Sequence, residues 1–393
     1  MLGTAGRWFA SLAVLAALGA TSALAAQPPS TLTPMEQLGK EIFFDKISDP
    51  PWMSCATCHG PTAGWTGPVA GVNLHGAVYR GAVPRRFGNR KPPSAAYATF
   101  SPVFHYDPVE ELFVGGNFWD GRATGEVLGN PAADQAGGPF LNPVEQNMPG
   151  KQAVCEHVAG AAYADLFEEA WGPGSLDCVA DVDGTYDRIA LSIAEYEASS
   201  EVNQFSSKFD YYLAGAVELT EQETWGMELF AGAAMCAACH PAPLFTDFTF
   251  DNLGVPKNPE NPFYDMDGVL IDGLPINPDG DAWIDPGLGG FLMTRPEWSG
   301  LAAENWGKHK VPTLRNVDAR PGGGFPKAYM HNGVFKSLEE VVHFYNTRDV
   351  EPWPPPEVAE NVNSDELGDL GLTPEEEAAV VAFMKTLSDG FEP

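Results

Sequence analysis

Hydrophobic residues recur with the spacing of an amphipathic α-helix in five stretches of the chain, whereas the alternating patterns typical of β-strands are weak throughout. The 42 glycines and 35 prolines concentrate in residues 60–150 and 241–330, where we expect ordered loops rather than long helices. The pattern therefore predicts a mainly α protein with long ordered loops. The expected helices cover residues 34–45, 185–213, 220–231, 337–346 and 374–387.

Two of these helices carry signals for a capped N-terminus. Thr220 stands three residues ahead of Glu223, and Thr373 stands three residues ahead of Glu376. This spacing lets a side chain and the backbone satisfy each other's hydrogen bonds at the start of a helix.

The helix expected at 337–346 has an apolar stripe that ends in a tyrosine. Leu338, Val341, Val342 and Tyr345 fall at i, i+3, i+4 and i+7, so they share one face. A buried phenol hydroxyl needs a partner. Tyr345 is therefore a candidate for a specific interaction.

The first residues of the chain are typical of a secretory signal peptide. A single positive charge at Arg7 precedes an apolar run and small residues, with a cleavage site expected after Ala25 or Ala26. We therefore expect residues 1–26 to be removed and the mature protein to be exported, with the bacterial periplasm as its first expected location. No later stretch has the apolar length needed to span a bilayer.

The formal net charge of −31 disfavours nucleic acid and anionic membranes as partners. It fits solubility, or a surface that docks a basic protein. The mature chain is long enough for two or three domains.

Four of the six cysteines lie in two C-x-x-C-H motifs, "CATCH" and "CAACH". This motif is the attachment signature of c-type haem, in which two thiols bond to the porphyrin and the adjacent histidine ligates iron. A zinc site would need further cysteine or histidine ligands at matched spacing, and the sequence offers none. We therefore expect two covalently attached c-type haems, at Cys55, Cys58 and His59 and at Cys236, Cys239 and His240.

The remaining cysteines, Cys155 and Cys178, lie between the two motifs. Because thiols oxidise in exported proteins, we expect a structural disulfide between them. Two free buried thiols are the alternative.

The segments that precede the two motifs resemble each other, "LGKEIFFDKISDPPWMSCATCH" and "WGMELFAGAAMCAACH". This similarity predicts an internal duplication of a cytochrome c unit. We therefore expect two cytochrome c-like haem domains, at residues 27–183 and 184–393.

Over nearly all of the mature chain, the sequence resembles the bacterial di-haem cytochrome c peroxidase superfamily, which includes the MauG enzymes. The segments that carry the resemblance include "LGKEIFFD", "SCATCH", "NFWDGRA", "DQAGGPFLNPVEQNM", "CAACH", "VPTLRNV" and "YMHNGVFKSLEEVVHFYN". The resemblance implies an N-terminal peroxidatic haem and a C-terminal electron-transfer haem, with His59 and His240 as their proximal ligands. It places Trp119, in "NFWDGRA", between the haems; core filling is the alternative role of this residue.

The resemblance also implies that "DQAGGPFLNPVE" forms the loop over the peroxidatic haem. Glu145 would be the acid/base group that moves a proton between the two peroxide oxygens, with Gln135 beside it and Pro139 lining the pocket. His75 follows His59 by sixteen residues and is a candidate distal ligand, although its surroundings match the family poorly. Without a distal histidine, the first iron is open to peroxide.

Aligned on "YMHNG", the position of the family's axial methionine at the second haem falls on Tyr345, and MauG-type members carry tyrosine there. The resemblance thus implies that Tyr345 ligates the second iron opposite His240. Met330 and His343 are rival ligands, and a buried tyrosine bonded to a carbonyl is the structural alternative. A phenolate stabilises higher iron oxidation states, whereas a methionine ligand raises the haem potential.

Calcium bound between the domains is a further implication of the resemblance. Asn89, in "RFGNRKPPS", would supply its side chain, and backbone carbonyls near Pro326 and Ala328 would complete the site. The insertion "DARPGGGFPKAY" disturbs this region.

These residues lead to three hypotheses of function. The leading one is a periplasmic di-haem enzyme that reacts with hydrogen peroxide and oxidises an external substrate, expected to be a protein, through high-valent haem iron in the manner of MauG. The second is a cytochrome c peroxidase that takes electrons from a small cytochrome or cupredoxin; Tyr345 argues against it and His75 for it. The third is a non-enzymatic electron-transfer cytochrome, which would have no use for Gln135 and Glu145. The resemblance allows a monomer or a homodimer.

Overall fold

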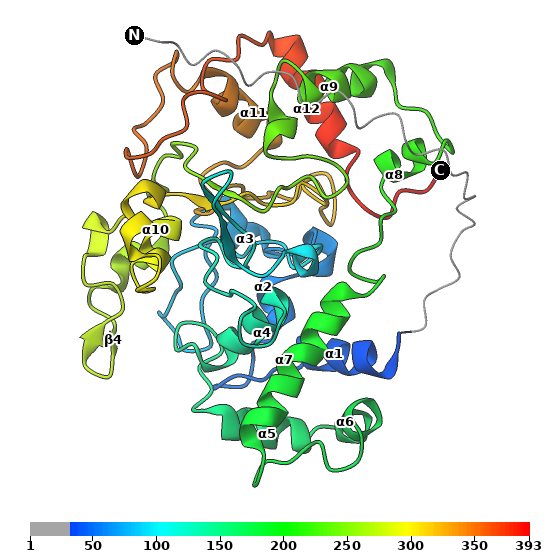
Figure 1. Ribbon diagram of the computed structural model, residues 1–393, viewed down its shortest axis with the longest axis vertical. Coiled ribbons are helices and arrows are strands. Elements are labelled where there is room, and N and C mark those ends of the chain that lie inside the picture. The colour runs from blue at the N-terminus through cyan, green and yellow to red at the C-terminus, as the bar shows by residue number, and fades with distance from the viewer. Residues whose placement is uncertain (1–31) are drawn as a thin grey trace.

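The computed structural model describes residues 32–393, and this part of the chain is mainly helical, with long ordered loops between the helices (Figure 1). The helices expected at 34–45, 220–231, 337–346 and 374–387 are present to within two residues at each end. The α-helices are α1 (Pro34–Phe44), α2 (Cys55–Cys58), α3 (Ala70–Leu74), α4 (Pro131–Leu141), α5 (Lys151–Ala159), α6 (Ala164–Trp171), α7 (Val182–Ala198), α8 (Lys208–Leu213), α9 (Glu221–Ala231), α10 (Gly287–Leu292), α11 (Leu338–Thr347) and α12 (Pro374–Lys385).

The strands of the described residues are two or three residues long and form three antiparallel pairs, β1 with β2, β3 with β6 and β4 with β5. None of them organises a core, in agreement with the weak strand patterns of the sequence. The strands are β1 (His105–Asp107), β2 (Leu112–Val114), β3 (Phe250–Asp251), β4 (Leu270–Ile271), β5 (Leu274–Pro275) and β6 (His309–Lys310).

Both helix caps expected from the sequence form. Thr220 Oγ1 accepts the backbone N–H of Glu223 at 3.2 Å, and the Glu223 carboxylate accepts the N–H of Thr220 at 2.7 Å. Thr373 and Glu376 make the same reciprocal pair at the start of α12. These capping boxes satisfy backbone donors that have no partner inside the helix.

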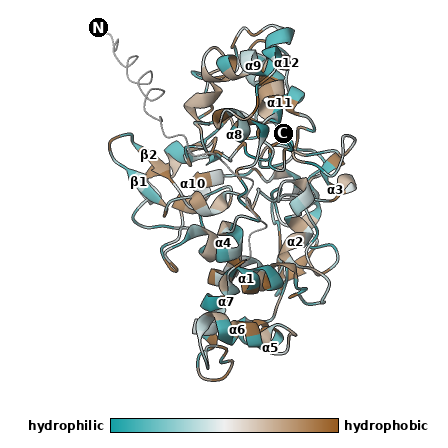
Figure 2. Cartoon of the chain, turned by 90° about the vertical axis from the view of Figure 1, so that its right-hand side faces the viewer, coloured by the Kyte–Doolittle hydropathy of each residue, from teal (hydrophilic) through white to brown (hydrophobic). Residues whose placement is uncertain are grey.

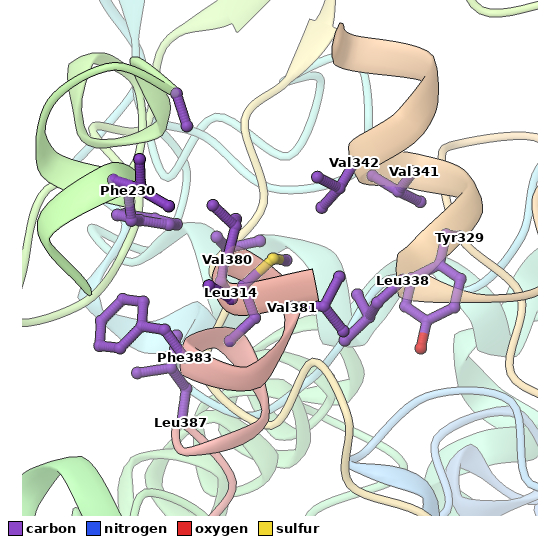
Figure 3. Close-up of a cluster of buried hydrophobic side chains, with 14 of the residues drawn as sticks. Phe230, Leu314, Tyr329, Leu338, Val341, Val342, Val380, Val381, Phe383 and Leu387 are labelled. Atoms are coloured by element: carbon purple, nitrogen blue, oxygen red, sulfur yellow. The ribbon is translucent and has the colours of Figure 1, made fainter. Parts of the chain in front are cut away.

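Two hydrophobic cores lie toward opposite ends of the molecule (Figures 1 and 2). The first packs α1, α4 and α7 together and buries Ile42 and Ile193 completely. The second packs α9, α11 and α12 around Leu338, Val381 and Phe383 (Figure 3). Each core stands beside one C-x-x-C-H motif, so the fold divides the chemistry between two halves.

In each half, the helix that precedes the C-x-x-C-H motif crosses a second helix at a glycine. A Cβ added at Gly39 of α1 would lie 1.8 Å from the backbone oxygen of Ser192 in α7, and one added at Gly226 of α9 would lie 1.8 Å from that of Ala379 in α12. Only a residue without a side chain permits this approach. The two halves therefore share one packing frame, which supports the duplication expected from the sequence.

Residues 185–213 do not form the single helix that the sequence predicts. They contain most of α7 and all of α8, separated by an extended break. The break is held by Asn203, whose side chain accepts the N–H of Tyr97 at 2.6 Å and donates to the backbone oxygen of Glu197 at 2.9 Å. A long-range contact of this kind leaves no trace in the local hydrophobic pattern.

The packing of α7 bears on where the two halves meet. α7 belongs to the first core, which extends to Val202, while the second core begins at Phe209. We therefore propose a division after α7 rather than between residues 183 and 184.

Cys155 of α5 and Cys178 form a disulfide with their Cα atoms 5.6 Å apart, which confirms the expected pairing. Across residues 32–393, no helix is both long and apolar enough to cross a membrane. The expected signal peptide lies outside the described residues.

Candidate active site

The first C-x-x-C-H motif opens a cavity of about 200 Å³, called here the His59 cavity. Cys55–Cys58 form α2 with both thiols unbonded, and His59 follows directly. His59 Nδ1 lies 3.3 Å from the carbonyl oxygen of Trp65, which can only accept, so Nδ1 carries the proton and Nε2 is left as a ligand atom. Burial lowers the pKa of His59 to about 4, which keeps the ring neutral.

The second motif opens a cavity of about 190 Å³, called here the His240 cavity, which Cys236, Cys239 and His240 line together. His240 Nδ1 donates to the carbonyl oxygen of Phe245 at 2.8 Å, so its Nε2 is again the available ligand atom. Burial lowers the pKa of His240, as it does that of its counterpart. The two motifs therefore have the same local chemistry.

Both cavities are far larger than the water-sized voids of an ordinary protein interior. Each is bordered by a motif with two unbonded thiols and by a neutral histidine whose other ring nitrogen is anchored on a carbonyl. Anchoring of this kind orients histidines that ligate metals. The donor sets thus fit the two covalently attached c-type haems that the sequence predicts.

A carboxyl group beside two amides forms part of the lining of the His59 cavity. Gln135, Asn142 and Glu145 all line it. Asn142 Nδ2 donates to Glu145 Oε2 at 2.7 Å, which orients the carboxyl group. Burial raises the pKa of Glu145, and the bond from Asn142 offsets part of that rise. This carboxyl can therefore hold a proton closer to neutral pH than a solvated one.

Two details of this wall differ from the expectation. Residues 131–141 form the helix α4, so Gln135 stands on a helix and not in a loop. Pro139 does not line the cavity: it lies within α4, where its carbonyl accepts the N–H of Gln146 at 3.1 Å. Pro139 thus supports the loop that carries Glu145 instead of contacting the cavity.

His75 does not reach the His59 cavity. It follows α3 at the protein surface, where its side chain is 67% exposed and its Nδ1 lies 3.3 Å from Glu260 Oε2. Its carbonyl oxygen accepts a hydrogen bond from Lys336 Nζ at 2.6 Å, which ties this segment to the second half. The arrangement does not support His75 as a distal ligand, because its ring is directed to Glu260 instead.

Tyr345 lines the His240 cavity from α11. The rival ligand Met330, which precedes α11, lines the same cavity. The hydroxyl of Tyr345 forms no hydrogen bond within the part of the chain that the structure describes, so the expected alternative of a bond to a carbonyl is not met. Burial raises the pKa of the phenol. A cation bound to the phenol oxygen would lower this pKa instead.

The rival ligand His343 points away from the His240 cavity. Its Nδ1 lies 3.0 Å from Glu377 Oε1, and its Nε2 lies 3.4 Å from Glu351 Oε2. Both ring nitrogens are therefore engaged by carboxylates, which leaves Tyr345 and Met330 as the candidate ligands in the His240 cavity.

Trp119 stands in the wall that the two cavities share. Its indole Nε1 donates to the carbonyl oxygen of Lys91 at 2.7 Å, and its own carbonyl accepts the N–H of Lys310 at 2.8 Å. The side chain is buried. This position agrees with the one that the resemblance implies.

Sequence reasoning missed several buried charged groups at these cavities. Lys91 and Lys310 line both cavities, and Glu197 of α7 lines the His59 cavity. Burial raises the pKa of Glu197 to about 8. The lysines could have been found from an internal repeat, because "KPPS" at 91–94 and "KVPT" at 310–313 share the pattern K-x-P-[S/T].

Asp285, His309 and His331 form a cluster at the His240 cavity, with potential ligand atoms within 4.8 Å of one another. The two imidazole rings stack with centroids 3.6 Å apart and planes 8° from parallel, so their nitrogen lone pairs run side by side and do not converge on one ion. Arg90 already binds Asp285 through two hydrogen bonds of 2.6 Å. The geometry favours a hydrogen-bonded cluster over a further metal centre.

The residues expected to bind calcium do not line one common cavity. Asn89 lines the His59 cavity, Ala328 lines the His240 cavity, and the carbonyl oxygen of Pro326 accepts a hydrogen bond from Asn73 Nδ2 at 3.1 Å. Their role in calcium binding stays a prediction.

Comparison with known proteins identifies the family. Residues 33–218 match the family model described as di-haem cytochrome c peroxidase. The methylamine utilization protein MauG of Paracoccus denitrificans is 34% identical over 409 residues, which cover 98% of this chain and 96% of that protein. The cytochrome-c peroxidase IdrP2 of Pseudomonas sp. (strain SCT) is 28% identical over 373 residues, covering 93% of this chain and 84% of that protein.

Solved structures agree with the sequence matches. The diheme peroxidase BthA from Burkholderia thailandensis E264 superposes with a TM-score of 0.73 at 27% identity, covering 92% of this chain and 90% of that chain. Its fold matches the helix-rich arrangement around two haem sites described above. The chain therefore belongs to the family of di-haem cytochrome c peroxidases and MauG proteins, and it is an oxidoreductase that uses hydrogen peroxide.

Proposed function

We propose that this protein reacts with hydrogen peroxide in the His59 cavity and oxidises an external protein substrate through the His240 cavity. The observation that carries the proposal is Tyr345, whose phenol lines the His240 cavity and has no hydrogen-bond partner in residues 32–393. An anionic oxygen ligand at that place favours the storage of oxidising equivalents over the uptake of electrons from a carrier.

In this proposal, Cys55 and Cys58 hold one haem and Cys236 and Cys239 hold the other, with His59 and His240 as proximal ligands. The bound haems supply the chemistry that takes up two oxidising equivalents from peroxide. The chain's contribution is to hold both groups, to exclude bulk water and to handle protons. The neutral state of both histidines, enforced by burial, is the state that ligation needs.

Glu145 is the proton-handling group of the proposal. Its carboxyl lines the His59 cavity, with one oxygen fixed by Asn142, which leaves the other oxygen for peroxide. As the carboxylate, Glu145 would accept a proton from one peroxide oxygen, and the carboxyl group so formed would return it to the other; a raised pKa favours the first transfer. Gln135 adds a neutral donor and acceptor that positions peroxide in the same cavity.

Trp119 is the proposed connection between the two sites. One hydrogen bond from the indole to the Lys91 carbonyl and one from the Lys310 N–H to the Trp119 carbonyl hold the residue in the shared wall. The indole N–H donates to a carbonyl oxygen, which cannot take up a proton at neutral pH. Electron movement through Trp119 is therefore not coupled to loss of the indole proton.

The second candidate is a peroxidase that reduces peroxide with electrons from a small redox protein. Met330 favours it, because this thioether lines the same His240 cavity as Tyr345. If Met330 is the ligand, the second haem has a higher potential and accepts electrons readily.

EPR and visible spectra of the ferric protein, before and after one equivalent of peroxide, test the proposal. We expect a high-spin EPR signal beside a low-spin signal. After peroxide is added, both signals should disappear and stay absent for a long time. Two low-spin haems that react with peroxide only after half-reduction would contradict it. They would assign the protein to the second candidate.

Export to the periplasm and calcium binding between the halves belong to the same proposal. Calcium would involve Asn89 and carbonyls near Pro326 and Ala328, and its removal by a chelator should alter the haem spectra reversibly. The net charge of −31 supports a basic surface on the partner protein.

A further inference from the structure

Two lysines in the wall between the cavities have no acidic partner within residues 32–393. Lys91 and Lys310 each line both cavities. The ion pairs that lysines make elsewhere in residues 32–393 involve other lysines. Burial lowers the pKa of Lys91 to about 8 and that of Lys310 to about 7, and no carboxylate offsets this effect.

The ammonium groups are held by neutral oxygens. Lys91 Nζ donates to Thr66 Oγ1 and to the carbonyl of Pro92, both at 3.1 Å. Lys310 Nζ donates to three oxygens, from Ser101, Gly116 and Asn117. These contacts fix the position of each cation, but they leave its charge uncompensated.

The two lysines occupy equivalent places in the duplicated halves. Each begins a K-x-P-[S/T] segment, whose hydroxyl residue anchors the segment beside its own haem motif. Ser94 Oγ donates to the carbonyl of Gly64 at 2.9 Å, and Thr313 Oγ1 donates to the carbonyl of Leu244 at 2.6 Å. The fold therefore puts one cation from each half into the common wall.

A buried ammonium without a counter-charge costs several kcal/mol, so the missing negative charge should come from what fills the cavities. A c-type haem carries two carboxylate groups on its porphyrin. The two haems of the proposed function would bring four carboxylates into cavities whose common wall holds two uncompensated cations.

We propose that Lys91 and Lys310 form a positive wall common to both haem sites, which balances haem carboxylates and raises the reduction potentials of both haems together. The inference rests on the haem assignment of the proposed function and not on its substrate. A positive charge stabilises the reduced form of a nearby redox centre by Coulomb attraction.

The test uses the full-length, haem-loaded protein and the variants Lys91→Met and Lys310→Met. Haem content is measured by the pyridine haemochrome assay, and the two midpoint potentials are measured by spectroelectrochemical titration without peroxide. Each variant should keep two haems and lower both potentials, and the double variant should lower them further. A shift at one haem alone, or at neither, would overturn the inference.

Lys336→Met is the matched control. Lys336 Nζ also donates to three carbonyl oxygens, at 2.6–2.8 Å, but the residue lines neither cavity. Its removal should leave both potentials unchanged. A shift equal to that of the wall variants would show a general structural effect and overturn the inference.

Arginine variants decide the case in which the methionine variants fail to load haem. Lys91→Arg and Lys310→Arg keep the charge, so loading with nearly unchanged potentials supports the inference. Failure of the arginine variants as well would mean that shape and not charge is required, which overturns it. Because none of these measurements uses peroxide or a partner protein, unshifted potentials leave the proposed oxidation intact.

Discussion

The two halves of the molecule share a frame but line their cavities differently. In both, a helix crosses another at a glycine, a C-x-x-C-H motif follows, and a neutral histidine is anchored on a carbonyl. The His59 cavity then receives Glu145 and Gln135, whereas the His240 cavity receives Tyr345 and Met330.

In the proposed function, this difference separates two tasks that a single haem site would have to combine. Proton transfer needs a carboxyl group whose pKa is tuned by burial, which the His59 cavity supplies in Glu145. Control of a redox potential needs a defined iron ligand, and Tyr345 and Met330 line the His240 cavity as the two candidates for that role. The shared frame keeps the two sites at a fixed relation, with Trp119 in the wall between them.

The largest effect is expected from Glu145→Gln, which removes the proton carrier from the His59 cavity alone. The amide still accepts the hydrogen bond from Asn142 but cannot shuttle a proton, so the peroxide reaction should slow by about 10²–10⁴-fold. Stopped-flow mixing with peroxide measures the rate. The spectrum of the second haem should not change.

Glu197→Gln is the matched control for this rate. Glu197 lines the same cavity, and its raised pKa keeps it mostly protonated at pH 7, so glutamine is a close substitute. The peroxide rate should stay near that of the wild type. Equal losses in both variants, or no loss in Glu145→Gln, would remove Glu145 from the mechanism.

The next largest effect is expected from Tyr345→Met, which alters the His240 cavity alone. If the phenol is a ligand, a thioether in its place should raise the potential of the second haem by tenths of a volt, within the ~0.8 V range that axial ligands cover. Tyr329→Phe is the control, because Tyr329 lines the same cavity but its hydroxyl contacts Arg320. An unshifted potential in Tyr345→Met would assign the site to Met330.

Local signals explain what the sequence could predict. The caps at Thr220 and Thr373 and the two C-x-x-C-H motifs depend on residues that are close in the chain, so their spacing suffices. The stripe that ends in Tyr345 also follows from helical periodicity, and α11 does bring it to the His240 cavity.

Contacts between distant segments explain what the sequence could not predict. The sequence did not predict the helix α4, because Gly137, Gly138 and Pro139 give this segment the composition of a loop. Its packing against α7 stabilises the helix. His75 has a ligand-like spacing from His59, yet the fold directs its ring to Glu260. Spacing alone cannot reveal that competition.

A smaller effect should come from the shared frame itself. Gly39→Ala and Gly226→Ala each place a methyl group 1.8 Å from a carbonyl oxygen, so the crossing helices must move apart at a cost of about 1–3 kcal/mol or more. Urea unfolding followed by tryptophan fluorescence measures the loss. Comparable losses in both variants would support equivalent frames.

Gly71→Ala is the control for the frame, because a Cβ at Gly71 of α3 meets no atom within 4 Å. It should be neutral or slightly stabilising, since alanine favours a helix over glycine by up to ~1 kcal/mol. If only one of Gly39→Ala and Gly226→Ala destabilises the protein, the two crossings are not equivalent.

A pH dependence of stability is also expected from the His59 cavity. Burial holds the pKa of Glu197 at about 8, above the value of 4.5 for a free glutamate, so the folded protein keeps a proton that the unfolded chain releases. Stability from this group is therefore lost as pH rises between these values, by up to ~1.4 kcal/mol per pH unit. Glu197→Gln stays neutral and should be more stable than the wild type at pH 8 but not at pH 4.

Glu126→Gln provides a contrast of opposite sign. Its hydrogen bonds with Arg295 lower the pKa of Glu126, so this carboxylate contributes stability above pH 4.5 and loses it as pH falls. The pair is partly exposed to solvent, and its removal should cost less than about 1 kcal/mol at neutral pH. Urea unfolding midpoints measured across this pH range would distinguish the pH dependence of Glu197→Gln from that of Glu126→Gln. A pH-independent difference between Glu197→Gln and the wild type would mean that Glu197 is charged in the folded protein, and that the His59 cavity stabilises a second carboxylate beside Glu145.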